Sequence, residues 1–261
     1  MPLKEINILR RHGCQYVPDL RRVELPVIFR GKPVIGRDIT VAEAKLMTSL
    51  CPVGAIGVTS VASGIENATL VMDIGKCVFC RECEFALPSK IRFTNDYKLA
   101  TNIRERLLVV AGEDQPLRLD QEMVRKEIRS FFKHALKLRQ VSAGGDNSAE
   151  MELNAAGNVN FDMGRYGIEF VASPRHADGI VITGPITQNM AEALQICYEA
   201  VPSPKIVILA GTDAINGGIF DGSAALNREF LNKYPVDLFV PGNPPHPLTF
   251  INGILDLIGC K

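Results

Sequence analysis

The hydrophobic pattern divides the chain into two halves of different character. In the second half, short apolar runs recur at regular intervals, and we expect buried strands at 168–172, 179–183, 205–209 and 236–240. Between these runs, the composition and spacing of apolar residues predict helices over 187–200 and 247–258. Strands that alternate with helices are typical of a parallel sheet covered on both faces. The sequence therefore predicts an α/β domain from about residue 142, with functional loops at the carboxyl ends of its strands.

The first half lacks this alternation. Residues 1–50 mix short apolar runs with Arg and Pro, which favours extended segments and turns, except that 40–50 predicts a helix with Thr40 as its N-cap. After a polar linker at 112–116, apolar residues at helical spacing over 121–139 predict an amphipathic helix with a basic face. We interpret it as a surface helix packed on the core. The alternative is a helix on an anionic membrane surface or an acidic partner.

Composition and charge narrow the function classes. The 261 residues are 46% hydrophobic and 22% charged, which is ordinary for a globular protein and excludes a disordered or coiled-coil chain. The net charge of zero gives no argument for nucleic-acid binding, and we expect none. Residues 1–50 hold nine Lys and Arg against five Asp and Glu, and residues 121–139 hold six against two. Two segments of charge +4 are thus balanced by a remainder of −8, which is typical of a subunit with distinct interaction faces.

The sequence shows neither a membrane span nor a leader. Its apolar runs stay far below the roughly 18 residues that a membrane-spanning helix needs. The first 13 residues carry charges and no long apolar core, so they do not resemble a secretion signal. We therefore expect a cytoplasmic protein, peripheral to any membrane it contacts.

Four of the seven cysteines form a ligand pattern. Cys77, Cys80 and Cys83 are separated by two-residue gaps, and Cys51 stands directly before Pro52. Three closely spaced thiolates with a remote Cys-Pro are typical of a 4Fe–4S site. The alternatives are a zinc site, which usually pairs two separated Cys-x-x-Cys turns, and a coincidence of buried thiols. The remaining cysteines lack ligand spacing, and we interpret them as incidental: Cys14, Cys197 and Cys260.

Residues 40–93 resemble a two-cluster bacterial ferredoxin domain in which one cluster site is lost. The resemblance places the ligands of the other cluster at positions that are all apolar here, namely Val41, Ala44, Met47 and Leu87. It therefore implies one 4Fe–4S cluster, held by Cys51, Cys77, Cys80 and Cys83, with the second site packed as core.

Residues 124–258 resemble the small subunit shared by membrane-bound nickel–iron hydrogenases, formate hydrogenlyase and respiratory complex I. The stretches that carry the resemblance are Ser173–Asp178, Gly184–Met190, Gly211–Gly218 and Pro241–Pro247. In that family four cysteines hold a 4Fe–4S cluster, and here their positions fall on Asp146, Ala149, Asp213 and Asn243. Carboxylate and amide oxygens suit iron–sulfur clusters poorly, so we expect this cluster to be absent. We interpret the site as a refilled cavity. The alternative is a new oxygen-ligand metal or proton site.

These expectations define an architecture: an N-terminal bacterial-ferredoxin-like α+β domain followed by a flavodoxin-like parallel-sheet small-subunit domain. We expect an N-terminal extension at 1–39, the one-cluster domain at 40–111, a linker and basic helix at 112–141, and the small-subunit-like domain at 142–261.

The resemblance implies an electron-transfer subunit of a membrane-associated hydrogenase-like or complex-I-like assembly, without a catalytic site of its own. Its implied partners are a large-subunit-like protein and membrane-embedded antiporter-like subunits. The alternatives are a structural or coupling subunit whose cluster does not cycle, and a stand-alone ferredoxin-type carrier.

Overall fold

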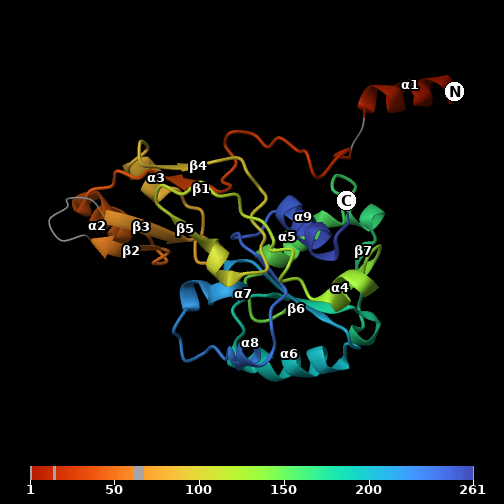
Figure 1. The fold of residues 1–261 in the computed structure, drawn as a ribbon. Helices are drawn as coiled ribbons and strands as arrows, with labels where there is room; N and C mark the ends of the chain where they lie inside the picture. Colours follow the sequence, from red (N-terminus) through yellow and green to blue (C-terminus); the bar gives the residue numbers. More distant parts are fainter. Residues whose placement is uncertain (1, 14–15, 62–67, 261) are drawn as a thin grey trace.

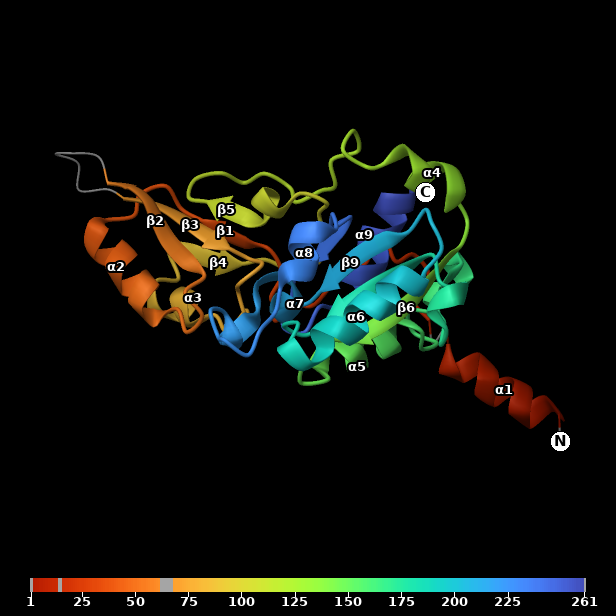
Figure 2. The same cartoon turned by 90° about the horizontal axis from the view of Figure 1, so that it is seen from below.

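The computed structural model describes residues 2–13, 16–61 and 68–260. In Figures 1 and 2, the orange and yellow strands of the first half lie beside the green and blue α/β half. A separate helix, α1 (Pro2–His12), projects from this body in both views. In the described ranges, no helix combines the length and hydropathy needed to cross a membrane.

A five-stranded parallel sheet forms the centre of the second half. Its strands are β6 (Leu136–Ser142), β7 (Ile168–Phe170), β8 (Gly179–Thr183), β9 (Ile206–Ala210) and β10 (Leu238–Val240). They lie in the order β10-β9-β8-β6-β7, and every neighbouring pair is parallel. In chain order this is 5-4-3-1-2, the flavodoxin-like arrangement. The expected α/β fold class is confirmed.

Helices cover both faces of this sheet. The α-helices of this half are α4 (Lys126–Phe131), α5 (Ser148–Ala156), α6 (Gln188–Ala200), α7 (Thr212–Asn216), α8 (Glu229–Lys233) and α9 (Pro247–Ile258). Figure 1 shows α6 and α8 on one side of the sheet and α5 and α9 on the other. Successive β8 residues accordingly enter different cores: Ile180 joins the core that includes Leu194 of α6, and Val181 joins the core that includes Ile254 of α9. Short 3-10 helices complete the chain at Arg104–Leu107, Met163–Tyr166, Pro174–His176 and Gly218–Phe220.

The first half is built on two small antiparallel sheets. One has the order β2-β3-β5, from β2 (Ile56–Val61), β3 (Ala68–Asp73) and β5 (Leu108–Val110). The other pairs β1 (Pro33–Ile35) with β4 (Ile91–Phe93). Helices α2 (Val41–Leu50) and α3 (Glu82–Ala86) belong to the same half. A capping box between Thr40 and Glu43 starts α2, which confirms the helix and the N-cap expected there.

The predicted amphipathic helix over 121–139 is wrong. Only Lys126–Phe131 is helical, and the chain then enters β6, which pairs with both β7 and β8 in the sheet. Leu136 and Leu138 are fully buried while Lys137 between them is exposed, which is the two-residue period of a strand. The apolar positions fit a helix over the longer window, but tertiary pairing decided the outcome. The surface-helix and membrane-helix interpretations of this segment therefore lose their basis.

Elsewhere the expected elements are present with small shifts at their ends. The structure confirms the four strands and two helices predicted in the second half as β7, β8, β9, β10, α6 and α9. In the N-terminal segment, α1 is a helix where we expected extended chain and turns. The domain boundaries stay predictions, although β6 starts at Leu136, ahead of the expected boundary at residue 142.

Candidate functional site

The four cysteines of the ligand pattern line one cavity. Cys51 caps the C-terminus of α2, Cys77 and Cys80 lie on the turn that follows β3, and Cys83 lies in the first turn of α3. Cys77 and Cys83 are each 7% exposed. The other walls are largely apolar and include Val53, Ile56, Met72 and Phe93. Two segments far apart in sequence thus bring four thiols together in one mostly apolar cavity. We call it the four-cysteine cavity.

Backbone amides point at two of these sulfurs. The Phe79 N–H donates to Cys77 Sγ at 3.3 Å, and the Ala55 N–H donates to Cys51 Sγ at 3.1 Å. The turn needs an uncommon backbone, because Phe79 and Arg81 have φ values of 54° and 69° without being glycine. Such conformations persist where surrounding contacts hold them, and they cluster at binding sites. The conformation of this turn therefore depends on the contacts that hold these two residues.

The cavity disfavours free thiolates. Burial, together with weaker like-charge repulsion from Cys83, Cys51 and Cys80, raises the pKa of the Cys77 thiol to about 12, although the hydrogen bond from the Phe79 N–H lowers it. Burial and the nearby Cys80 and Cys51 likewise raise the pKa of Cys83 to about 11. Four thiolates can share such a space only when cations neutralise them. The arrangement is electrostatically suited to a thiolate-bound metal centre.

Two residues that sequence reasoning missed hold this turn from outside. Arg30 donates through Nη1 to the Phe79 carbonyl at 2.9 Å, and the Thr212 hydroxyl lies 3.1 Å from the Cys77 carbonyl oxygen. Thr212 is 135 residues away in sequence and belongs to the α/β half. A polar Thr at the end of an apolar strand carries no signal for such a contact, so spacing alone did not identify it.

The four positions that the ferredoxin resemblance assigns to a second cluster contribute to packing. Ala44 and Met47 are 1% and 0% exposed and belong to the hydrophobic core. Val41 and Leu87 are partly buried against the same core. The four apolar positions therefore contribute to packing, as expected from their residue types.

The four positions that the small-subunit resemblance assigns to lost cysteines also converge. They line one cavity at the carboxyl edge of the parallel sheet, formed in part by Asp146, Ala149, Asp213 and Asn243. We call it the acidic cavity, because the buried Glu150 lines it too. Burial raises the pKa of Asp213, and the charges of Asp146 and Glu150 raise it further, whereas hydrogen bonds from Ser148 lower the pKa of Asp146.

Its carboxylates do not converge on a point. Across residues 2–13, 16–61 and 68–260, no three His, Cys, Asp or Glu side chains meet closely enough to hold a single metal ion, either in this cavity or in the four-cysteine cavity. The Glu150 carboxylate accepts the Thr183 hydroxyl at 2.5 Å, and the Asp146 carboxylate accepts the Ser148 hydroxyl at 2.6 Å. Both carboxylates are thus engaged with local hydroxyl groups.

The other cysteines lie apart from the ligand set. Cys197 is half-buried on α6 and packs against the core, and Cys260 follows α9; neither lines the four-cysteine cavity. Cys14 lies outside the described residues.

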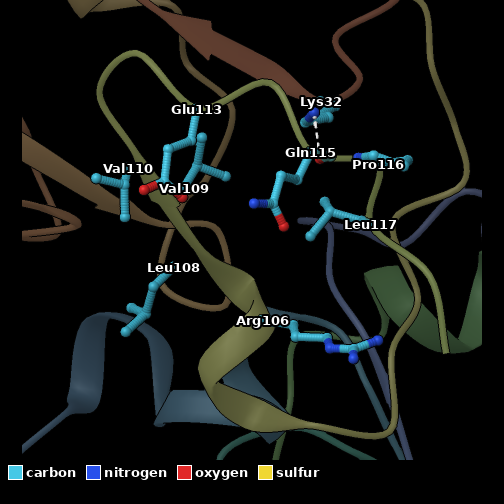
Figure 3. A pocket seen from close by; sticks show the side chains of 9 residues that line it. All are labelled: Lys32, Arg106, Leu108, Val109, Val110, Glu113, Gln115, Pro116 and Leu117. Atoms are coloured by element: carbon cyan, nitrogen blue, oxygen red, sulfur yellow. Dashed lines mark hydrogen bonds between the residues drawn. The ribbon is translucent and has the colours of Figure 1, made fainter. Parts of the chain in front are cut away.

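A further cavity of about 440 Å³ lies beside the edge strand β5, away from the cysteines (Figure 3). Lys32, whose side chain is 6% exposed, donates to the Gln115 carbonyl at 2.5 Å and pairs with Asp114 at 2.6 Å. The lining is otherwise a mixture of apolar and polar residues, with Arg106 and Glu113 as its other charged residues. Because the Lys32 ammonium is already paired, this cavity offers no comparable set of free donors, and we assign it no chemistry.

Comparison with known proteins identifies relatives of the second half. The family described as NADH ubiquinone oxidoreductase, 20 Kd subunit, matches residues 147–257. A probable membrane-bound hydrogenase subunit of Pyrococcus furiosus is 39% identical over 115 residues, which are 44% of this chain and 69% of that protein. An NADH-quinone oxidoreductase subunit of Geotalea daltonii is 41% identical over 107 residues, which are 41% of this chain and 62% of that protein.

The corresponding NADH-quinone oxidoreductase subunit of Heliobacterium modesticaldum is 44% identical over 108 residues, which are 41% of this chain and 62% of that protein. The chain therefore spans less than two thirds of the length of each of these two oxidoreductase subunits. A solved structure, titled as the membrane-bound sulfane sulfur reductase, an archaeal respiratory membrane complex, has 30% identity and a TM-score of 0.43 over 49% of this chain and 70% of that chain. Because the hydrogenase relative is matched over more than two thirds of its length, this chain belongs to the family of the NADH ubiquinone oxidoreductase 20 Kd subunit.

Proposed function

We propose that this chain is an iron–sulfur electron-transfer subunit of a membrane-associated, hydrogenase-like or complex-I-like assembly. It holds one 4Fe–4S cluster on Cys51, Cys77, Cys80 and Cys83 of a ferredoxin-like domain. It lacks the cluster that the family resemblance places in the α/β domain. The observation that carries the proposal is the convergence of these four thiols on one cavity.

The donor set fits an iron–sulfur cluster. Thiolate sulfur is the preferred ligand of iron in such clusters, and hydrogen bonds to the sulfurs tune their potential. The amides of Phe79 and Ala55 supply such bonds to Cys77 and Cys51. When bound, the cluster supplies one-electron transfer. The chain supplies the four ligands, the amide donors and a mostly apolar wall that limits water.

Family membership supports the assembly. The relatives include a probable membrane-bound hydrogenase subunit and subunits of NADH-quinone oxidoreductases. We propose that this chain likewise binds a large-subunit-like partner, and through it membrane-embedded antiporter-like subunits. Its place would be peripheral, on the cytoplasmic face of the membrane complex.

A second candidate function is favoured by the acidic cavity. The side chains of Asp146, Ala149, Asp213 and Asn243 line this cavity with carboxylate, amide and methyl groups. Carboxylates are poor ligands for a sulfide-bridged cluster. An electron relay through the α/β domain would then lack a cluster at its sheet edge. Under this candidate, the chain is a structural or coupling subunit whose single cluster stabilises the fold without cycling.

The two candidates separate in the assembled complex. Cys80→Ser removes one ligand from the half-exposed part of the cavity, and Cys197→Ser is a matched control on α6. If the chain transfers electrons, Cys80→Ser abolishes redox turnover while the complex still assembles, and Cys197→Ser keeps both. Loss of assembly with Cys80→Ser alone would favour the structural role. Purification as a free monomer without partners would contradict both and favour a stand-alone carrier.

A further inference from the structure

The turn that carries Cys77 is held by α7 of the α/β half. Thr212, the first residue of α7, is 1% exposed, and its hydroxyl lies 3.1 Å from the Cys77 carbonyl oxygen. It lies equally close to the Gly242 carbonyl oxygen, which also accepts the Thr212 N–H at 2.9 Å. In the described part of the chain, no other donor reaches the Cys77 carbonyl. Loss of the hydroxyl would therefore leave the Cys77 carbonyl without a donor, whereas the Gly242 carbonyl would keep the Thr212 N–H.

The contact belongs to a close junction between the two halves. Figures 1 and 2 both show α7 at the boundary between the yellow and the blue segments. A Cβ atom added to Gly75 would come within 2.9 Å of Ile215 Cγ2, so the chain entering the turn already touches α7. Lys76 pairs with Asp221 at 3.3 Å across the same junction. The Cys77 turn thus rests directly on the α/β half.

The same turn is held at its other end. Arg30 donates to the Phe79 carbonyl at 2.9 Å, and the Phe79 N–H donates to Cys77 Sγ at 3.3 Å. Two carbonyls, at Cys77 and Phe79, are therefore fixed by side chains outside the ferredoxin-like sheets and helices. The amide that contacts the sulfur lies between these two fixed points. Loosening either point will disturb the N–H···S geometry.

We propose that Thr212 is a positioning residue for the cluster. Through this residue of the α/β half, both the retention and the reduction potential of a cluster in the ferredoxin-like half depend on the α/β half. This inference rests on the proposed function, because it assumes that Cys77 is a cluster ligand. Thr212 also lines the acidic cavity. It therefore links the four-cysteine cavity with the pocket that resembles a lost cluster site.

The expected effect follows from one buried hydrogen bond. Thr212→Val keeps the branched shape and leaves the Cys77 carbonyl without its donor. If the cost of that unsatisfied buried group falls on the cluster-bound state, iron release should accelerate about tenfold. Weakening the N–H···S bond removes a donor that favours the more negative, reduced cluster. The midpoint potential should therefore fall. Thr212→Ser retains the hydroxyl and should behave as wild type.

The experiment uses the full-length chain purified anaerobically. Iron release to a ferrous chelator and the midpoint potential from a dye-mediated EPR titration are measured for wild type, Thr212→Val and Thr212→Ser. Thr249→Val is the matched control, since this hydroxyl is also 1% exposed and donates to a backbone carbonyl, that of Tyr97, at 2.7 Å. We expect Thr249→Val to lower thermal stability while leaving both cluster readouts at wild-type values. Thr212→Ala is a second variant if Thr212→Val does not fold.

The outcomes separate this inference from the proposed function. Wild-type protein without iron and sulfide would overturn the proposed function and this inference together. Wild-type protein with a cluster, and Thr212→Val or Thr212→Ala with unchanged release and potential, would overturn this inference alone. So would equal changes in Thr212→Val and Thr249→Val, because they would indicate general destabilisation.

Discussion

The four-cysteine cavity and the acidic cavity are two pockets of similar construction with different donor atoms. Each gathers residues from segments far apart in sequence, and each lies beside Thr212, which lines one and bonds the turn of the other. The first offers four thiols and two amide donors directed at sulfur. The second offers carboxylates and an amide, with hydroxyl donors already bound to two of its carboxylates.

This difference teaches that one arrangement of loops can bring together four positions that carry different donor atoms. The parallel sheet, its loops and their glycines are present at the acidic cavity, where Gly211 and Gly242 have φ values of 96° and 141°. Those loops bring the four positions together without thiols. The fold therefore indicates where a binding site can form, and the side chains at that place determine which chemistry the site supports.

The largest expected effect comes from removing the remote ligand. Cys51→Ala should reduce the iron content from about four atoms per chain to less than one, because one iron of the cluster would lose its only protein ligand and the buried site would be left incomplete. Cys197→Ala, on α6, should retain the wild-type content. Colorimetric iron and sulfide assays on anaerobically purified protein measure both. Retention of iron in Cys51→Ala would remove this residue from the ligand set.

Placing four cysteines in the acidic cavity should convert it into a second cluster site. A quadruple variant with Asp146→Cys, Ala149→Cys, Asp213→Cys and Asn243→Cys should raise the iron content from about four to about eight atoms per chain after cluster reconstitution. The reason is that the structure already brings these positions to one cavity. An unchanged iron content in a folded variant would mean that more than the ligands separates the two cavities.

The thiols of the metal-free protein should react slowly and in a defined order. Burial raises the pKa of Cys77 to about 12 and of Cys83 to about 11, so both thiols stay protonated at pH 8. Since only the thiolate is nucleophilic, their alkylation should accelerate about tenfold for each pH unit until the pKa is reached. Mass spectrometry after iodoacetamide treatment resolves each site. Equal rates at Cys77 and the half-exposed Cys80 would contradict the buried geometry.

The smallest effect is expected in the acidic cavity. Burial and the charges of Asp146 and Glu150 raise the pKa of Asp213, so its ionised form opposes folding as the pH rises through that pKa. Asp213→Asn should therefore raise the melting temperature at pH 8 by about 2 °C, with a smaller gain at pH 4, where more of the carboxyl is protonated than at pH 8. Differential scanning calorimetry at both pH values tests this. A loss of stability at pH 8 would indicate that the carboxylate has a favourable partner.

The sequence predicted local features best. The cysteine spacing located the four-cysteine cavity, and the Thr40 N-cap located the start of α2, because both depend on residues close in sequence. The buried strands of the second half were also evident, since β8 and β9 are continuous apolar runs. Such runs are typical of central parallel strands.

Features set by long-range contacts were beyond the sequence. The segment 136–142 carries apolar residues that fit a helix or a strand, and its pairing with β7 and β8 selected the strand. Likewise, Arg30 and Thr212 reach the Cys77 turn from 49 and 135 residues away, and no spacing rule links them to it. Sequence reasoning therefore located the four cysteines that line one cavity but missed the residues that bond to their turn.

The most direct test of the central claim is a count of iron and acid-labile sulfide in anaerobically purified full-length protein, with EPR after dithionite reduction. One cluster in the four-cysteine cavity and none in the acidic cavity predicts about four irons, about four sulfides and one reducible cluster signal per chain. Eight irons would contradict the assignment of the acidic cavity, and zinc without iron would contradict the 4Fe–4S site itself.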